Sequence, residues 1–460
     1  MKLSASFVLA LVTAAPLLAE PLSRADAVRI ALEANPDVKK AGENLNRLRG
    51  IVTEARADAL PELKLFGQWT RSRDPSLLNS PSFDSFPPDF TALLVPVPGS
   101  LWDGYATLKQ TLFNFKVGRA LKAAKLATQS GQEEIRRVHQ AVALLAVQAY
   151  NEYVLGRERV RVAGAAVKQK EIQLETTRNR RTAGVATDVD VLRFEVDLEN
   201  ARAVLLTQEG AAELARGRLN AVLVRPIGSP IEATDGLDYQ EMTVSPQQAV
   251  AAAWSTRPEV QQVDLEERIR DHFIGIAKAD LRPSLEFSGS FGWSTRKTQN
   301  FFDPDYQRWS TGFVLTIPVF DGFRTAGKVA QAQAEKNKVT QDRIALENQI
   351  RLEAQDAVDR LNVAKKVLDA AELNLKQAQK ALSMIQANYK FGAATLLDVI
   401  DAQAAQTQAD SNRIQALYTH ANARATLRFV MAQDPLDPAP GVPATPPPAA
   451  TTLGSPDSGT

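Results

Sequence analysis

The sequence predicts a mainly α-helical, internally duplicated fold, in which long coiled-coil hairpins are joined to transmembrane β-strands. The duplication is read from similar segments around Pro36 and Pro61, whose prolines recur as Pro258 and Pro283, each 222 residues later. Seams of Leu and Ala in steps of three and four residues predict the coiled-coil hairpins. Segments of about ten residues with alternating apolar and polar side chains predict the strands. Because the repeat of roughly two hundred residues far exceeds solenoid periods, each half is expected to build the same structure.

The composition excludes several classes of site. The chain has 460 residues and a formal net charge of +1, so nothing indicates a nucleic-acid partner. It contains no Cys, which excludes disulfides, thiol chemistry, Cys-based metal sites and a Cys-linked lipid anchor. His139, His272 and His420 lie on different predicted helices without a neighbouring ligand pattern, and no G-x-S-x-G motif or Gly-rich phosphate loop occurs. We therefore expect no enzyme activity, and no catalytic residue, metal or cofactor.

Residues 1–19 are expected to form a secretory signal peptide, because Lys2 precedes an apolar run at 7–18. Cleavage after Ala14, Ala15 or Ala19 stays open. Downstream there is no run of eighteen or more apolar residues, so no transmembrane helix is expected in the exported chain. A closed β-barrel is the other structure that crosses a bilayer, because it also satisfies every backbone polar group internally.

Long helices are expected in both halves. The predicted ranges are about 22–59, 117–182 and 187–223 in the first half, and about 246–280, 325–390 and 395–432 in the second. The seam residues are Ile135, Val138, Val142, Leu145 and Ala149 in the first half, and Leu361, Ala364, Leu368, Ala371, Leu375, Ala378, Leu382 and Ile385 in the second. A helix of about 65 residues would be on the order of 100 Å long. That length exceeds a globular domain.

A strand pair is expected in each half, within 61–113 and 284–320. The apolar members are Leu63, Leu65 and Trp69 in the first pair, and Leu285, Phe287, Phe291, Trp293, Phe313, Leu315 and Ile317 in the second. A half-buried strand of a soluble sheet explains one such segment better, but four beside overlong helices favour a membrane sheet. Four strands cannot close a barrel, for which about eight is the smallest useful number. The chain must therefore combine its strands with those of identical copies, most simply in a closed cyclic oligomer.

These features divide the chain into five parts. They are the signal peptide at 1–19, repeat 1 at 20–223, a linker at 224–245 that adds short elements, repeat 2 at 246–433, and a Pro-rich tail at 434–460. The tail cannot bury a core and is expected to be disordered. A Pro-, Ser- and Asp-rich stretch at 72–100 lengthens the first strand pair, as expected for an outward-facing loop.

The chain resembles the TolC-type outer-membrane efflux proteins over about residues 22–433. The resemblance is carried by Asn35-Pro36, Leu60-Pro61, the IPVFDGFR segment at 317–324, and twin G-x-A-T-x-x-D-V turns that begin at Gly184 and Gly392. It implies a homotrimer with a twelve-stranded barrel in the outer membrane of a Gram-negative bacterium, four strands per protomer, continued by an α-helical tunnel across the periplasm.

The resemblance also implies a function. The protein would be the passive exit duct of a tripartite efflux pump or a type I secretion system. Its partners would be outer-membrane lipid, a periplasmic adaptor that docks at the hairpin tips, and an inner-membrane transporter. The tip residues are Gly184, Thr187, Gly392 and Thr395.

The twin turns are also readable from physical chemistry. Gly184 and Gly392 end long helices and should adopt the left-handed conformation that glycine allows. The next helices should then begin with capping-box pairs, Thr187 with Asp190 and Thr395 with Asp398. For Asp190, helix capping and a functional role are equally good interpretations.

Asp398 and Asp401 are three residues apart and should share one helix face. If three copies converge, six carboxylates would ring the narrow end of the tunnel, favour cations, bind multivalent cations and raise the pKa of some members. In the family, the matching positions form an acidic constriction closed by hydrogen bonds and ion pairs among tip residues. Tyr389 and Asp190 match members of that network. Ala394 departs from it, at a place where the best-known member carries a basic residue.

A periplasmic coiled-coil adaptor or scaffold without a pore is the alternative function, since its long hairpins and export signal would look similar. Two hairpins, each joined to an amphipathic strand pair, favour the channel. The transported substrate cannot be read from the sequence.

Overall fold

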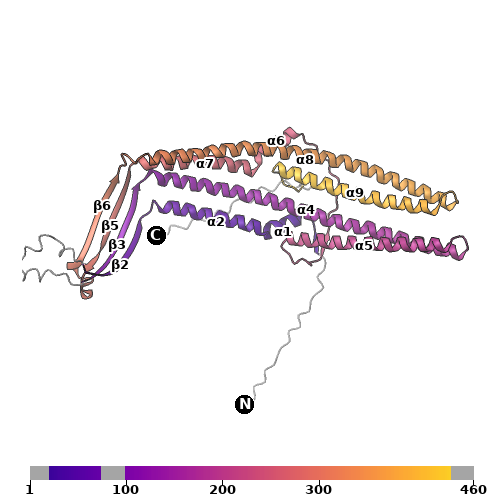
Figure 1. The fold of residues 1–460 in the computed structure, drawn as a ribbon, viewed down its shortest axis with the longest axis horizontal. Helices are drawn as coiled ribbons and strands as arrows, with labels where there is room; N and C mark the ends of the chain where they lie inside the picture. The colour runs from indigo at the N-terminus through magenta and orange to yellow at the C-terminus, as the bar shows by residue number, and fades with distance from the viewer. Residues whose placement is uncertain (1–19, 74–98, 437–460) are drawn as a thin grey trace, which may run out of the picture. The chain divides into compact units, whose positions relative to one another are not determined.

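The computed structural model describes residues 20–73 and 99–436, and its elements repeat as predicted (Figure 1). The helices pair as α1 (Arg24–Ala34) with α6 (Pro246–Thr256), α2 (Pro36–Ala57) with α7 (Pro258–Lys278), α4 (Phe115–Thr182) with α8 (Arg324–Lys390), and α5 (Asp188–Val222) with α9 (Leu396–Val430). The strands are β1 (Glu20–Leu22), β2 (Glu62–Ser72), β3 (Gly99–Phe113), β4 (Ile231–Ala233), β5 (Ser284–Thr295) and β6 (Gln307–Thr316). The expected signal peptide, most of the 72–100 loop and most of the tail lie outside the described residues.

The single helices predicted at 22–59 and 246–280 are wrong, because each is two helices. The breaks fall at Asn35 and Arg257, whose backbones are extended with ψ of 130° and 132°. Both residues precede proline, whose ring disfavours the helical conformation of its predecessor. Asn35 then caps α2, since its Oδ1 accepts a hydrogen bond from the Asp37 backbone nitrogen at 2.8 Å. After α7 the second copy adds a short 3₁₀ helix, Ala279–Leu281.

The described residues form two compact units. The first comprises the described parts of Met1–Gly42, Glu134–Val260 and Ala345–Thr460, and the second those of Glu43–Glu133 and Gln261–Ile344. In the first unit β1 pairs in parallel with β4. Tyr150 is fully buried beneath this pair; its hydroxyl donates to the Leu22 carbonyl and accepts from the Asp235 backbone nitrogen, both at 3.0 Å. The 224–245 linker thus ties the start of the described chain to α4.

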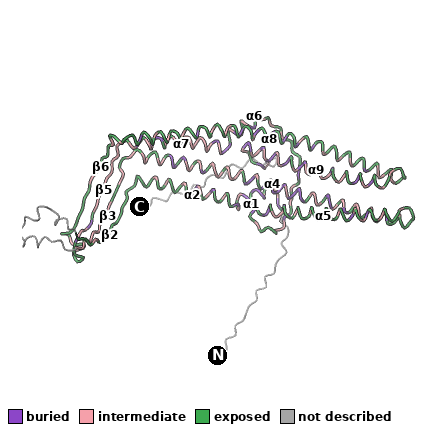
Figure 2. The backbone as a smooth tube through the Cα atoms, in the orientation of Figure 1, coloured by how far each residue is buried: buried purple, intermediate pink, exposed green. Residues whose placement is uncertain are grey.

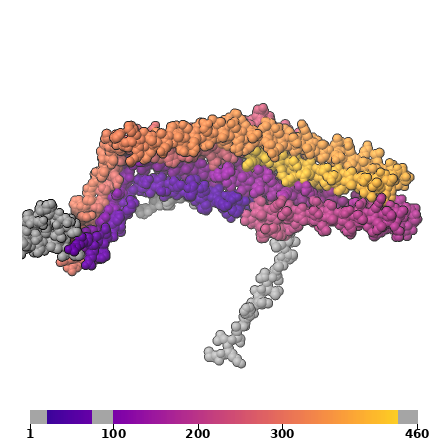
Figure 3. Space-filling model, in the orientation of Figure 1, coloured from indigo at the N-terminus to yellow at the C-terminus, as the bar shows by residue number. Residues whose placement is uncertain are grey.

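Within the first unit, α4 and α5 form one helical hairpin and α8 and α9 another. Figure 3 shows the yellow α9 lying along the orange α8. Small side chains allow close packing: a Cβ added to Gly156 of α4 would lie 3.0 Å from the Ala212 Cα of α5. The predicted seam of α8 includes the buried Leu361, Ala364, Leu368 and Leu382.

The seam predicted for α4 needs one correction. Leu145 is 47% exposed, whereas Val142, Ala146 and Tyr150 are buried. The buried face advances by four residues at each of these steps, which leaves Leu145 beside it. Figure 2 shows buried stretches alternating with exposed ones along the helices. No helix in the described ranges combines the length and the apolar character needed to cross a bilayer.

The second unit holds an antiparallel sheet with the strand order β2-β3-β5-β6. Its register places the predicted apolar residues on one face, namely Leu63, Leu65 and Trp69 of β2, Leu285, Phe287, Phe291 and Trp293 of β5, and Phe313 and Leu315 of β6. Trp309 of β6, which was not predicted, lies on the same face. Ile317 follows the end of β6. Successive side chains of a strand point to opposite faces, so the polar residues between them share the other face.

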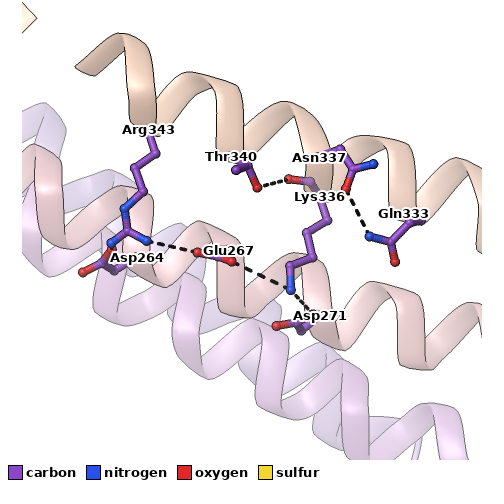
Figure 4. Close-up of polar contacts among 8 residues, drawn as sticks. All are labelled: Asp264, Glu267, Asp271, Gln333, Lys336, Asn337, Thr340 and Arg343. Atoms are coloured by element: carbon purple, nitrogen blue, oxygen red, sulfur yellow. Dashed lines mark hydrogen bonds and ion pairs between the residues drawn. The ribbon is translucent and has the colours of Figure 1, made fainter. Parts of the chain in front are cut away.

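An ion-pair ladder joins α7 to α8 in the second unit (Figure 4). Lys336 contacts Asp271 at 2.8 Å and Glu267 at 3.8 Å, and Arg343 contacts Glu267 at 3.3 Å and also Asp264. These side chains are partly exposed, so each pair contributes little stability by itself. The ladder bridges α7 and α8 along this stretch.

The close approach of α4 and α5 gives a testable expectation. Replacing Gly156 by Val forces a side chain against the Ala212 backbone and should lower the free energy of unfolding by about 1–3 kcal/mol. Gly164→Val is the matched control, because no atom lies within 4 Å of a Cβ there, and it should change stability by no more than about 0.5 kcal/mol. Urea unfolding followed by circular dichroism measures both. Equal effects of the two variants would contradict close packing at Gly156.

Candidate functional site at the hairpin tips

The tip of the first hairpin is a glycine turn between α4 and α5. Gly184 has a φ of +75°. Its nitrogen donates to the Arg181 carbonyl at 2.8 Å, and the Val185 nitrogen donates to the Arg180 carbonyl at 2.9 Å. This pair of hydrogen bonds satisfies two carbonyls that the end of a helix leaves unpaired. The predicted left-handed glycine is confirmed.

The tip of the second hairpin repeats this geometry. Gly392 has a φ of +77°. Its nitrogen donates to the Tyr389 carbonyl at 3.2 Å, and the Ala393 nitrogen donates to the Asn388 carbonyl at 2.9 Å. Both tips are therefore closed by the same backbone motif, and no atom lies within 4 Å of the position a Cβ would take on either glycine.

The predicted capping boxes are present in both copies. The Asp190 carboxylate accepts from the Thr187 nitrogen at 2.9 Å and from its hydroxyl at 2.7 Å, while the Asp190 nitrogen donates to the Thr187 hydroxyl at 3.2 Å. Thr395 and Asp398 make the same three bonds at 2.7, 2.7 and 3.2 Å. Aspartate is long enough to close the box, and each carboxylate also lies at a helix N-terminus, where negative charge is favoured.

The hydrogen bonds set the charge state of both capping carboxylates. The pKa of Asp398 is lowered, first by the side-chain and then by the backbone hydrogen bond from Thr395. The pKa of Asp190 is lowered first by the backbone and then by the side-chain hydrogen bond from Thr187, with smaller contributions from the positive charges of Arg193 and Arg180. Both are therefore ionised at neutral pH.

Asp401 differs from both. It is exposed one turn after Asp398, on the same face of α9, and makes no hydrogen bond or ion pair with any residue in the described ranges. Asp398 is also exposed. The start of α9 therefore carries two solvated carboxylates, one used for helix capping and one that bonds to none of the described residues.

Arg180 links the two hairpins. Its guanidinium carbon lies 4.9 Å from the centre of the Tyr389 ring, a cation–π contact between the end of α4 and the end of α8. Beneath it, Phe194 is 1% exposed in an apolar cluster with Leu174 and Leu198, against which Leu396 of α9 packs. Side chains of both hairpins thus form one small core at the tips.

A groove runs between the hairpins beside this contact. It is lined by residues of α4, α8 and α9, among them Gln169, Gln173, Thr177, Arg180, Gln386, Tyr389, Lys390 and Gln403. The apolar side chains of Ile172, Leu396 and Val399 complete the lining, so the groove is amphipathic.

The structure brings together only some of the residues expected at the site. Tyr389 meets Arg180, whereas Asp190 bonds to Thr187, and no hydrogen bond joins Asp190 to Tyr389 within the described residues. Asp188, which the sequence reasoning missed, forms an ion pair with Arg181 across the first tip. The signal that could have found these contacts is the pair of arginines in the last turn of α4.

The histidines lie apart from the tips. His139 and His272 are partly buried on α4 and α7, and His420 is 2% exposed on α9 beside Tyr239. Across the described ranges, no group of three His, Cys, Asp or Glu side chains is placed to hold a metal ion.

Comparison with known proteins finds a matching family and several relatives. The chain matches the family described as "Outer membrane efflux protein" over residues 27–224 and 249–433. Outer membrane protein OprJ of Pseudomonas aeruginosa is 26% identical over 392 residues, which cover 82% of this chain and 77% of OprJ. Alkaline protease secretion protein AprF of the same species is 23% identical over 350 residues, covering 71% of this chain and 69% of AprF.

A solved structure shares the fold. The Campylobacter jejuni CmeC outer membrane channel superposes with a TM-score of 0.75 at 16% sequence identity, covering 89% of this chain and 85% of that one. The likeness extends over nearly all of the described helices and strands. At this identity it concerns the fold alone.

The capping boxes predict a pH dependence. Because the folded pKa of Asp398 lies below its ordinary value of 3.8, the box stabilises the tip fully above that value and loses this contribution as the pH falls through the lower folded pKa. Hydrogen exchange of the first turn of α9, corrected for intrinsic rates, should therefore accelerate below about pH 4. Asp398→Asn should already exchange fast at pH 7 and show no such step. A wild-type profile flat down to pH 2 would contradict the assignment.

The glycine turns predict a conformational cost. Gly392→Ala places a Cβ in a left-handed residue and should destabilise the second tip by about 1–2 kcal/mol, because the cost comes from φ alone. Hydrogen exchange at 388–396 should rise accordingly. Gly210→Ala, in the interior of α5 and equally free of neighbours, should instead stabilise the chain by about 0.5–1 kcal/mol. Unchanged exchange at the tip would show that Gly392 is not needed for the turn.

Proposed function

Because the chain belongs to the outer membrane efflux protein family, we propose that it is the passive exit duct of a tripartite efflux pump or a type I secretion system, gated at its hairpin tips. The protein is located in the outer membrane of a Gram-negative bacterium, with a large periplasmic portion. The family description names efflux and AprF is named for protease secretion, so both efflux and secretion are retained. The alternative of an adaptor without a pore has no support from the family match.

The observation that carries the proposal is the two-faced sheet. Leu65, Trp309 and Phe313 are 82%, 68% and 70% exposed, all on the same face. A soluble protein rarely leaves such a surface in water, whereas hydrocarbon chains of a bilayer would cover it. The opposite, polar face would then line a water-filled interior.

The open sheet edges support a homotrimer. β2 and β6 are the edge strands of the described sheet, and their outer backbone groups lack partners in it. Such groups cannot stay unpaired in a bilayer. Pairing β2 of one copy with β6 of the next satisfies them, and three copies of four strands give a closed barrel of twelve.

The tips supply the gate in this assembly. Three copies of Asp398 and Asp401 would form a ring of carboxylates at the periplasmic end of the tunnel, which favours cations. The Arg180–Tyr389 contact would hold the two hairpins of each protomer together in the closed state. The turns at Gly184, Thr187, Gly392 and Thr395 and the adjacent groove would receive the adaptor, and the inner-membrane transporter would supply the driving force.

A double substitution tests the gate. Asp398→Asn with Asp401→Asn removes the proposed ring and should lower the cation-to-anion permeability ratio several-fold in planar lipid bilayers. The matched control is Asp356→Asn with Asp359→Asn, an exposed pair on α8 with the same spacing and the same charge change, which should leave the ratio unchanged.

The outcomes separate the parts of the proposal. A chain that purifies as a monomer from membranes and conducts no ions would refute the duct. A conducting trimer whose selectivity is unaffected by the double substitution would remove these carboxylates from the gate and leave the duct intact.

A further inference from the structure

One row of the sheet breaks the pattern of its polar face. The register aligns Phe66 of β2 with Tyr105 of β3, Tyr105 with Gly292 of β5, and Gly292 with Arg308 of β6. They lie on the same face of the sheet as Lys64, Thr107 and Ser290, each of which is two positions from a member of the row on its own strand. Phe66 is 45% exposed there, a large aromatic side chain on a mainly polar face that also holds Leu101 and Val314.

The side chains of this row are stacked. The rings of Phe66 and Tyr105 lie 5.2 Å apart with an interplanar angle of 23°. The guanidinium carbon of Arg308 lies 5.6 Å from the centre of the Tyr105 ring. Phe66, Tyr105 and Arg308 therefore form one continuous stack, made of two aromatic rings and a guanidinium group. We name it the aromatic–guanidinium row.

Gly292 makes the stack possible. β5 separates β3 from β6, so their backbones are about 10 Å apart at two strand spacings. A Cβ on Gly292 would lie 2.1 Å from the Gly104 carbonyl oxygen and 2.4 Å from the Tyr105 Cβ. Position 292 therefore has no room for a side chain between Tyr105 and Arg308. The space left above Gly292 lets the Arg308 guanidinium reach the Tyr105 ring.

Among the described residues, no carboxylate pairs with Arg308. Elsewhere on this face, Lys64 pairs with Glu62 at 2.6 Å and Lys109 with Glu286 at 3.8 Å. Arg308 makes no hydrogen bond or ion pair with any residue of the described chain, so its N–H groups face solvent. Asp103, one row nearer the hairpin ends of the strands, is the neighbouring carboxylate on this face and does not pair with it.

We propose that the aromatic–guanidinium row is a binding site for small planar aromatic anions, such as aromatic carboxylates and sulfonates. Because Phe66 and Arg308 cover the two faces of the Tyr105 ring, the ring of the ligand lies across the exposed edges of Phe66 and Tyr105 in edge-to-face contact. Its anionic group accepts two N–H bonds from Arg308, whose planar fork matches a carboxylate. The location of the site rests on the proposed function. If the polar face lines a trimeric barrel, three such rows surround the exit path.

Binding can be measured without relying on the pore. The full chain in lipid nanodiscs is titrated with 2-naphthoate by isothermal calorimetry, with empty nanodiscs as the blank. We expect saturable binding that weakens at least tenfold in Arg308→Gln and in Phe66→Ala. Arg308→Lys should restore only part of the affinity, since a point charge lacks the planar fork. Asp103→Asn should strengthen binding by removing a like charge.

Two controls give the test its specificity. Lys109→Gln removes a cation of the same face that is already paired, and should leave the affinity within twofold. Cyclohexanecarboxylate carries the same charge without an aromatic ring, and should bind at least tenfold more weakly. No saturable binding of 2-naphthoate, or equal binding of the two anions, would overturn the proposal.

Channel recordings separate this inference from the proposed duct. 2-Naphthoate should shorten open times of the wild-type channel and should not affect Arg308→Gln. If the channel conducts but 2-naphthoate neither binds to it nor blocks it, the proposed anion site is wrong and the proposed duct is unaffected. If the chain binds the anion in nanodiscs but never conducts, the proposed duct is wrong and the anion site is unaffected.

Discussion

Close packing of helices through small side chains is the interaction on which the described structure depends. At Gly156 the α4 and α5 backbones approach until no side chain fits, and the alanines of α8 serve the same purpose in the second hairpin. Close approach lets long helices gain dispersion and apolar burial along their whole length. Ordering the 68 residues of α4 and the 67 residues of α8 costs conformational entropy. The gain from packing offsets this cost, which intrinsic helix propensity alone would not do. The tips are positioned because these seams fix the register of each hairpin.

The two tips show how a duplicated element can acquire different uses. Glycine geometry and capping boxes are the same in both, because they close a hairpin irrespective of what surrounds it. The charges differ. Basic residues at the end of α4 meet Asp188 in the first tip and Tyr389 in the second, whereas Asp401 meets no partner within the described residues. At the start of α9 this leaves an exposed carboxylate without a partner in the described residues, which is available for a role between copies.

The sheet follows a different physical rule from the helices. One of its faces is apolar and the other is mainly polar. Its backbone hydrogen bonds join its own four strands, so the outer edges of β2 and β6 have no partner within the sheet. The polar face is not uniform, because Gly292 allows an arginine to reach an aromatic ring two strands away. A single glycine thus creates a chemical feature that neither neighbouring strand would produce alone.

Local rules let the sequence by itself determine the duplication, most helix ends, the alternating strands, the left-handed glycines and both capping boxes. Each depends on residues a few positions apart, whose steric and hydrogen-bonding preferences are readable in order. Where the sequence analysis erred, at Asn35, Arg257 and Leu145, a proline effect was overlooked or two adjacent helical faces were confused.

Only the tertiary structure decided which distant residues meet. The Arg180–Tyr389 contact and the Phe66–Tyr105–Arg308 row join residues whose separation along the chain carries no periodic signal. Such contacts depend on strand register and on the packing of one hairpin against the other. Both are set by the sum of many weak interactions rather than by any local motif.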